Sequence, residues 1–232
     1  MTTVVRKTLF DVPETVQPIR WNEKARTVSA DEREIIRWIM LLHNDGEGFD
    51  LDPTYSTGRF WRGLPQPRLR FDIAPQIPGV IRADARNLPV ASNGVKSVMF
   101  DPPFVVAPSP RPGIIRDRFS CYRNIPDLLG FYRDALAEFW RIISVGGMVT
   151  VKCQDVVSGG INYMTHAATI VIAQKIGFYC QDLFILHRPN VLWSPNMANQ
   201  QHARKTHSYF LVFRKIPPTS RFRAAHILQE IK

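Results

Sequence analysis

The sequence has few cysteines and no long hydrophobic run. Its three cysteines, Cys121, Cys153 and Cys180, form no CxxC pair, which argues against a disulfide framework and against a structural zinc site. The longest apolar stretch, IIRWIMLL at 35–42, is interrupted by charge and is too short to span a bilayer. The first residues lack the layout of a signal peptide. We therefore expect a cytoplasmic protein in a reducing compartment, with no metal site and no membrane partner.

A glycine-rich phosphate-binding loop is also missing. Residues 51–61, LDPTYSTGRFW, place Ser56, Thr57 and Gly58 directly after an expected strand, where small and turn-forming residues let a ligand approach the backbone. A phosphate loop needs more glycines and a following Lys-Ser or Lys-Thr pair, and neither is present. The segment therefore predicts a binding loop for a ligand other than a nucleotide phosphate.

Positive charge is in excess. The formal net charge is +10 at pH 7. Each phosphate contact made by Lys or Arg releases counterions and adds affinity, so nucleic acid is the expected partner. A basic but otherwise ordinary surface is the alternative that charge alone leaves open.

Alternating strand and helix patterns predict an α/β fold in a single domain, residues 1–232. Amphipathic helices are expected at 29–43, 125–144, 161–177 and 222–232, and a capping box of Ser29 and Glu32 begins the first. Strands are expected at 48–52, 69–73, 79–84, 95–100, 148–153, 182–188 and 208–214. The alternation predicts a mostly parallel sheet with helices on both faces.

Acidic residues mark the ends of these strands. Asp72, Asp84 and Asp101 each end or directly follow one, and ligands of open α/β sheets bind beyond the carboxyl ends of the strands. Asp72 is placed to accept both hydroxyls of a ribose, and Asp84 to accept a hydrogen bond from an adenine amino group. The ordered set predicts a pocket for an adenosine.

The segments LDPTYSTG, RFDIAP, ADARNLP and FDPPF occur in this order. Their order resembles the motif series of the S-adenosylmethionine-dependent amino methyltransferases, which make N6-methyladenine and N4-methylcytosine in DNA. EFWRIISVGGMVTVKCQD at 138–155 and KTHSYFLVFRK at 205–215 resemble later strands of that family. The resemblance implies a single Rossmann-like class I methyltransferase domain, with a mostly parallel seven-stranded sheet and a C-terminal antiparallel strand. It also implies that the fourth strand lies beside the first, and that S-adenosyl-L-methionine is the cofactor.

The resemblance assigns catalysis to Asp101, Pro102, Pro103 and Phe104. The Asp101 carboxylate and the Pro102 carbonyl would accept hydrogen bonds from the two N–H groups of an exocyclic amino group. These two hydrogen bonds would expose the lone pair of the nitrogen. Phe104 would stack on a base rotated out of the helix. The implied cofactor-binding residues are Asp52, Pro53, Thr54, Ser56, Thr57, Gly58, Asp72, Ile73, Asp84, Ala85 and Asp101.

Two segments rich in Pro and Arg, 108–124 and 187–205, are predicted to be nucleic-acid-binding loops. Arg side chains bind phosphates, aromatic rings stack on bases, and Asn reads adenine edges. Ordinary solvated loops are the alternative. The candidate residues are Arg111, Arg116, Arg118, Phe119, Tyr122, Arg123, Arg188, Trp193, Asn196, Arg204 and Lys205.

The predicted function is site-specific DNA methylation at adenine N6, because the family motif begins here with Asp and not with Ser. Methylation of cytosine N4 or of an RNA base remains an alternative, as does a nucleic-acid-binding protein on a degenerate methyltransferase fold. The expected partner is DNA, or RNA under the second alternative. A short recognition region is compatible with a homodimer.

Overall fold

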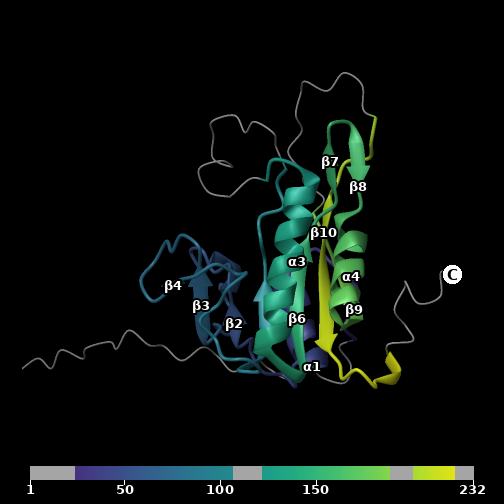
Figure 1. Ribbon diagram of the computed structural model, residues 1–232. Coiled ribbons are helices and arrows are strands. Elements are labelled where there is room, and N and C mark those ends of the chain that lie inside the picture. The colour runs from purple at the N-terminus through teal and green to yellow at the C-terminus, as the bar shows by residue number, and fades with distance from the viewer. Residues whose placement is uncertain (1–23, 107–121, 189–200, 223–232) are drawn as a thin grey trace, which may run out of the picture.

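The computed structural model describes residues 24–106, 122–188 and 201–222. Within these residues one eight-stranded sheet has the strand order β1-β9-β10-β6-β5-β2-β3-β4 (Figure 1). Its strands are β1 (Val28–Ser29), β2 (Leu51–Asp52), β3 (Leu69–Asp72), β4 (Ile81–Arg82), β5 (Val95–Phe100), β6 (Ile143–Cys153), β9 (Phe178–His187) and β10 (His207–Lys215). The helices are α1 (Glu32–His43), the short 3-10 helix η1 (Arg59–Trp61), α3 (Ile125–Ile142) and α4 (Thr165–Ile176).

The sheet is mostly parallel. Strand β10 runs antiparallel to both of its neighbours, β6 and β9, and the other pairs are parallel. Strand β5 lies between β2 and β6, which confirms the predicted place of the fourth strand beside the first. The expected count of seven strands was wrong. The additional strand, β1, has two residues and pairs with β9, and a segment so short carries no sequence periodicity.

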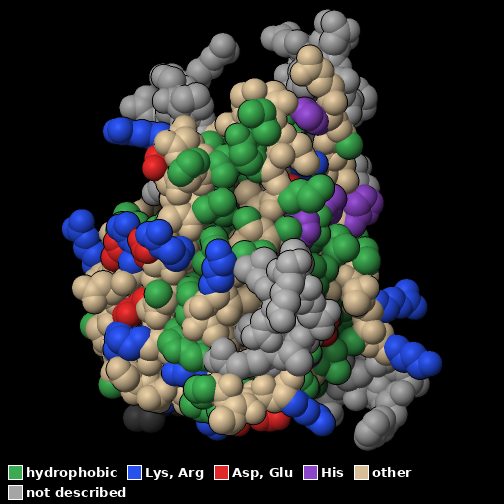
Figure 2. Space-filling view, turned by 45° about the vertical axis from the view of Figure 1, so that its right-hand side comes forward, with side chains coloured by type: hydrophobic (Ala, Val, Ile, Leu, Met, Phe, Trp, Pro, Cys, Tyr) green, Lys and Arg blue, Asp and Glu red, His purple; other side chains and the backbone are tan. Residues whose placement is uncertain are grey.

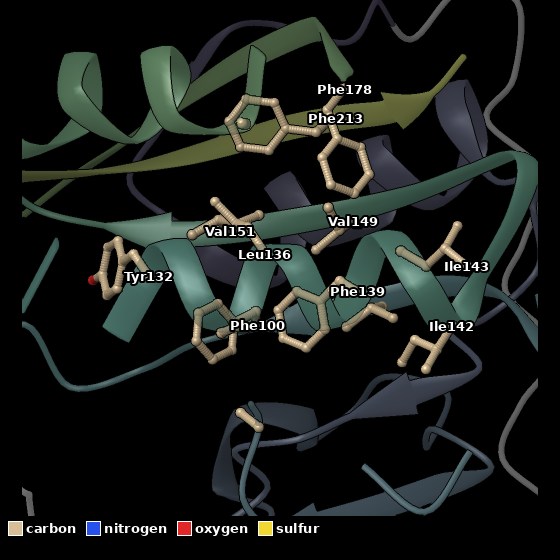
Figure 3. Packing of buried hydrophobic residues seen from close by; sticks show 14 of the residues in the cluster. Phe100, Tyr132, Leu136, Phe139, Ile142, Ile143, Val149, Val151, Phe178 and Phe213 are labelled. Atoms are coloured by element: carbon tan, nitrogen blue, oxygen red, sulfur yellow. The ribbon is translucent and has the colours of Figure 1, made fainter. Parts of the chain in front are cut away.

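Helices cover both faces of the sheet, as predicted: α3 and α4 lie on one face and α1 on the other. The alternation of side chains along β5 explains this, because Val98 and Phe100 pack on the α3 side while Met99 packs on the α1 side. The Phe100 and Phe139 rings meet edge to face with centroids 5.0 Å apart (Figure 3). Burying each such ring stabilises the fold by about 1.5–3 kcal/mol.

The predicted start of the first helix was wrong. Helix α1 begins at Glu32 with Asp31 as its N-cap, whose side chain accepts a hydrogen bond from the Arg33 N–H at 2.9 Å. Ser29 instead lies in β1, where its hydroxyl donates to Glu34. No capping box forms, because the Glu32 side chain is engaged with Lys152.

Two other helix boundaries also differ. The helix expected at 161–177 begins only at Thr165, because 161–163 form strand β8 (Ile161–Tyr163) of a hairpin with β7 (Val156–Ser158). The helix expected at 125–144 ends at Ile142, and Gly146 and Gly147 lie within β6 and do not end the helix. The expected terminal helix lies outside the described residues except for Phe222. No helix in the described part of the chain is long and apolar enough to cross a lipid bilayer.

Candidate active site

A cavity of about 940 Å³ lies at the carboxyl ends of β2, β3, β4 and β5. All four residues of the predicted catalytic motif line it: Asp101, Pro102, Pro103 and Phe104. Of the predicted cofactor residues, Pro53, Thr54, Ser56, Asp72, Ile73, Asp84 and Ala85 line the same cavity. The structure therefore brings most of both predicted sets to one place. Asp52, Thr57 and Gly58 do not line it.

Hydrogen bonds join the predicted catalytic motif to the loop that follows β2. The backbone N–H of Asp101 donates to Thr54 Oγ1 at 3.1 Å, and this hydroxyl donates to Asp52 Oδ1 at 3.0 Å. Strand β5 brings Asp101 to this point, since Phe100 at its end is fully buried. The position of the Asp101 backbone is therefore set by the loop as well as by its own strand.

Asp52 anchors this loop and does not itself line the cavity. Its carboxylate is buried and accepts hydrogen bonds from the Thr54 N–H and from the Trp61 indole N–H, both at 2.7 Å. Burial raises the pKa of Asp52 to about 7, although the N–H donors favour the ionised form. The structure thus places Asp52 as a support for the loop. Gly58, in the left-handed region at φ +72°, allows the turn into η1.

Asp72 and Asp84 line the cavity in different ways. The Asp72 carboxylate accepts the backbone N–H groups of Ser56 and Ala74, each at 2.8 Å, and so joins the ends of β2 and β3. Asp84 forms an ion pair with Arg86, with Oδ2 and a guanidinium nitrogen 2.6 Å apart. The hydrogen bond from Arg86 lowers the pKa of Asp84, so this acid is ionised at neutral pH.

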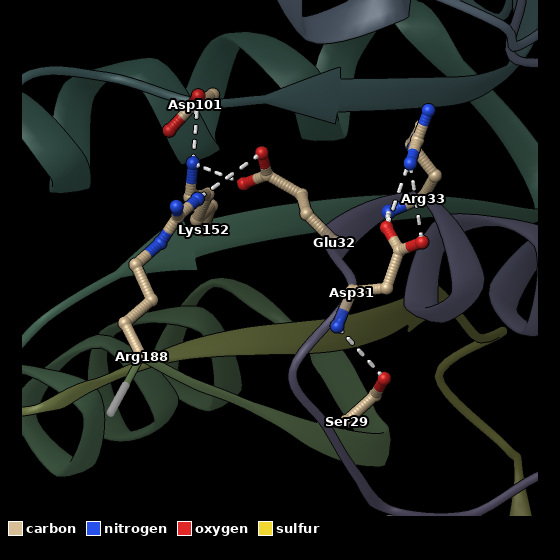
Figure 4. Close-up of polar contacts among 7 residues, drawn as sticks. All are labelled: Ser29, Asp31, Glu32, Arg33, Asp101, Lys152 and Arg188. Atoms are coloured by element: carbon tan, nitrogen blue, oxygen red, sulfur yellow. Dashed lines mark hydrogen bonds and ion pairs between the residues drawn. The ribbon is translucent and has the colours of Figure 1, made fainter. Parts of the chain in front are cut away.

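Lys152, near the end of β6, is a cavity residue that sequence reasoning missed. Its Nζ lies 3.1 Å from Asp101 Oδ2 and 2.6 Å from Glu32 Oε1 (Figure 4). Burial raises the pKa of Asp101, and the Lys152 ammonium acts against that effect. A signal was present in the sequence, because Lys152 is the one charged residue of the expected strand MVTVKC at 148–153.

The cavity is acidic although the chain is basic. Among the described residues, its lining contains five carboxylates and two basic side chains, namely Asp72, Asp84, Asp101, Asp127 and Asp134 against Arg86 and Lys152. Because a negative cavity attracts cations, this balance favours a positively charged ligand over a phosphate. Asp127, Phe131 and Asp134 come from α3 and were not among the predicted site residues. The described residues hold no group of three His, Cys, Asp or Glu side chains that could bind a metal ion.

The predicted nucleic-acid-binding residues are only partly described. Tyr122 lines the cavity beside Phe131, with ring centroids 5.6 Å apart. Arg123, Arg188, Arg204 and Lys205 do not line it. The remaining candidates, Arg111, Arg116, Arg118, Phe119, Trp193 and Asn196, lie outside the described residues. In the view of Figure 2, the described Lys and Arg side chains are spread over the visible face and its margins, some of them beside Asp or Glu, and are separated by other side chains.

No protein-family model matches the sequence, and no curated protein is significantly similar to it. Solved structures with a related fold include TTHA0409 from Thermus thermophilus, named as a candidate DNA modification methylase and complexed with S-adenosyl-L-methionine. It is 23% identical, with a TM-score of 0.43, over 60% of this chain and 56% of that one. The cytosine-N4-specific PvuII DNA methyltransferase is 16% identical, with a TM-score of 0.45, over 58% of this chain and 48% of that one.

A third similar structure is BH2331 from Bacillus halodurans, named as a candidate methyltransferase. It is 11% identical, with a TM-score of 0.44, over 82% of this chain and 100% of that one. The chain thus spans about half the length of the two DNA methylases, 56% and 48% respectively.

Proposed function

We propose that this protein is an S-adenosyl-L-methionine-dependent methyltransferase acting on the exocyclic amino group of a nucleobase in DNA, with adenine N6 as the target. One observation carries the proposal. The Asp101-Pro102-Pro103-Phe104 segment lines the same cavity as Thr54 and as the acids that end the neighbouring strands. The proposed hydrogen-bond acceptor of the amino group and the loop proposed to bind the adenosine thus line one cavity.

The cavity suits this cofactor in charge and in size. S-adenosyl-L-methionine supplies an electrophilic methyl group on a sulfonium cation, and five of the seven described charged residues that line the cavity are acidic. The volume of about 940 Å³ is at the upper end of the range for small-molecule sites, so both a nucleoside cofactor and a base have room. In the proposal Asp72 binds the ribose hydroxyls, and Ile73 and Ala85 border the adenine.

Methyl transfer to an exocyclic amino group requires the protein to raise the reactivity of a poor nucleophile. The lone pair of an exocyclic amino group is delocalised into the ring, and two acceptors against its N–H bonds favour a pyramidal nitrogen. The Asp101 carboxylate is one acceptor and the Pro102 carbonyl is the other, with its direction fixed by the Pro102-Pro103 backbone. Phe104 offers a ring on which the base stacks. The remaining contribution is to hold nitrogen, methyl carbon and sulfur in line.

The experiment is methyl transfer from labelled S-adenosyl-L-methionine to duplex DNA and, separately, to tRNA, with the modified nucleoside identified by mass spectrometry. We expect N6-methyladenine in the duplex. N4-methylcytosine in the duplex would show that cytosine N4 is the target. Label found only in tRNA would show that the target is an RNA base. A folded sample that does not bind S-adenosyl-L-methionine in calorimetry would refute the enzyme proposal and favour a nucleic-acid-binding protein on this fold.

Two variants separate catalysis from cofactor binding. Asp101→Ala should lower kcat by about a hundredfold or more, with cofactor affinity within a few-fold of the wild type, because an acceptor needed in the transition state is removed. Asp72→Ala should weaken cofactor binding first. Glu47→Gln, an exposed acid away from the cavity, is the control. Activity that survives Asp101→Ala would disprove the assigned role.

A further inference from the structure

We infer that Lys152 and Glu32 set the charge of Asp101: Lys152 holds this carboxylate ionised and in place at the cavity, and Glu32 moderates that effect by binding the same ammonium. Both are positioning residues, since they would act on the reaction through Asp101. The inference rests on the proposed function for its kinetic readout, whereas the arrangement of charges can be tested without it.

The three side chains come from three different elements. Asp101 follows β5, Lys152 lies in the neighbouring strand β6, and Glu32 is the first residue of α1 (Figure 4). The pairing of Phe100 with Val151 brings the next residue of each strand, Asp101 and Lys152, side by side. The Lys152 ammonium lies between two carboxylates, 3.1 Å from Asp101 and 2.6 Å from Glu32.

This group of charges is largely withdrawn from water. The exposed fractions of the side chains are 12% for Lys152, 22% for Glu32 and 25% for Asp101. The rings of Phe60 and Phe210 flank the ammonium, with centroids 5.3 and 5.8 Å from Nζ. Charges in such a site are screened less than surface charges, so removing one of them changes the protonation of the others.

The effects on Asp101 have opposite signs. Burial raises the pKa of Asp101, the Lys152 ammonium lowers it, and the Glu32 carboxylate raises it. For Lys152, burial lowers the pKa, but Asp101 and Glu32 outweigh burial and keep the ammonium charged. Lys152 thus favours the ionised form of Asp101, and Glu32 competes with Asp101 for the Lys152 ammonium.

Other groups also act on Asp101. Arg188 follows β9, lies 3.5 Å from Glu32 and lowers the pKa of Asp101. Asp52, at the end of β2, and Tyr132, on α3, are near enough to interact electrostatically with the same carboxylate. These groups stay unchanged in variants of Lys152 and Glu32, so the direction of each expected shift depends on the substituted residue.

Because Asp101 acts as an ionised acceptor, kcat/KM should fall as the pH falls through its pKa. Lys152→Met removes the stabilising cation, so this acidic limb should move upward by about one to two pH units. Glu32→Gln removes the competing acid, so the limb should move downward, by about half a unit to one unit. Lys152→Arg keeps the cation and should keep the limb near its wild-type position.

The test is the pH profile of methyl transfer for these variants, with Glu34→Gln as the matched control. Glu34 is an exposed acid in the same turn of α1, and its loss should leave the limb in place. A purely structural role for Lys152 would lower activity by the same factor at every pH. An unmoved limb in Lys152→Met, or a shift of the same sign in Lys152→Met and Glu32→Gln, would overturn the inference.

A second measurement needs no activity. In protein with 13C-labelled aspartate carboxyl carbons, the Asp101 resonance can be assigned by its absence in Asp101→Asn, and its titration midpoint followed by NMR. Midpoints that move in opposite directions in Lys152→Met and Glu32→Gln support the inference even if no methyl transfer is found, in which case the proposed function fails alone. Unchanged midpoints in both variants would overturn the inference. If Lys152→Met does not fold, Glu32→Gln should still lower the midpoint while Lys152→Arg leaves it near the wild-type value, and an unmoved midpoint in Glu32→Gln would then overturn the inference.

Discussion

Substitution of Glu138 should weaken both the fold and the wall of the cavity. This α3 side chain is 9% exposed, and its Oε1 accepts the Leu88 N–H at 2.7 Å and an Arg141 guanidinium N–H at 2.6 Å. Arg141 in turn donates to the Val90 carbonyl at 2.8 Å. The ion pair therefore ties α3 to the segment after β4, which carries the cavity residues Asp84 to Arg86.

In Glu138→Gln, an amide NH₂ replaces the oxygen that accepts the Arg141 Nε–H at 2.8 Å. A hydrogen bond to a charged group contributes about 1.5–3 kcal/mol. Since Arg141 is 39% exposed and water can replace part of that bond, we expect a loss of about 2 kcal/mol. For a chain of this size, that corresponds to a fall in Tm of about 4–8 °C.

The pH dependence makes the test specific. The hydrogen bond with Arg141 lowers the pKa of Glu138 in the folded state. The stabilisation is therefore complete above the unfolded pKa of about 4.3, and it is lost as the pH falls through the lower folded pKa. Urea unfolding of wild type and variant should show the full difference near pH 7 and a smaller one below about pH 4. Glu47→Gln is the control, and a Glu138→Gln difference that is absent at neutral pH, or that stays constant with pH, would refute this account.

Two further substitutions test the supports of the site. Trp61→Phe removes the indole donor to Asp52 and should cost about 1–3 kcal/mol. The indole N–H favours the ionised form of Asp52, and with a pKa of about 7 this form is present at pH 8 but not at pH 5. The loss in thermal unfolding should therefore be larger at pH 8 than at pH 5, and an equal loss would contradict the raised pKa. Gly147→Ala would place a Cβ 2.5 Å from the Lys96 carbonyl oxygen and should cost about 3 kcal/mol. Gly146→Ala meets no atom within 4 Å and should cost about 1 kcal/mol through its positive φ alone, so equal Tm values for the two variants would contradict the predicted clash.

The parts of the fold that were predictable from sequence are those with local periodicity. Strand β5 and helices α1 and α3 each carry repeating apolar positions. The bounds of β5 were predicted correctly, and the two helices were predicted with errors only at their ends. The errors have tertiary causes. Helix α1 begins at Glu32 with Asp31 as its N-cap, because Ser29, the expected cap, lies in β1 and pairs with β9. Strand β1 exists only because β9 offers it an edge.

The candidate site follows the same division. The acids at the strand ends were identifiable, because chain order and the topology of parallel sheets place them at one edge. The contacts among them were not. Asp52 belongs to the expected cofactor loop by sequence, yet its carboxylate faces the Trp61 indole, nine residues further on. Lys152 is separated from Asp101 by 51 residues, and only the pairing of β5 with β6 makes them neighbours.

The charges of the chain and of the cavity have opposite signs, and this separates two binding tasks. The net charge of +10 favours contact with a polyanion over the surface as a whole, whereas the five acids and two bases that line the cavity in the described part of the chain favour a cation. Under the proposed function, phosphates would stay outside while a neutral base enters, and the acidic lining would discourage a phosphate from following it. The ammonium of Lys152 is the basic group paired with Asp101 itself. Glu32 partly neutralises this ammonium, so Lys152 attracts an anion less strongly. The contact that moderates the effect of Lys152 on the pKa of Asp101 therefore also keeps the cavity acidic.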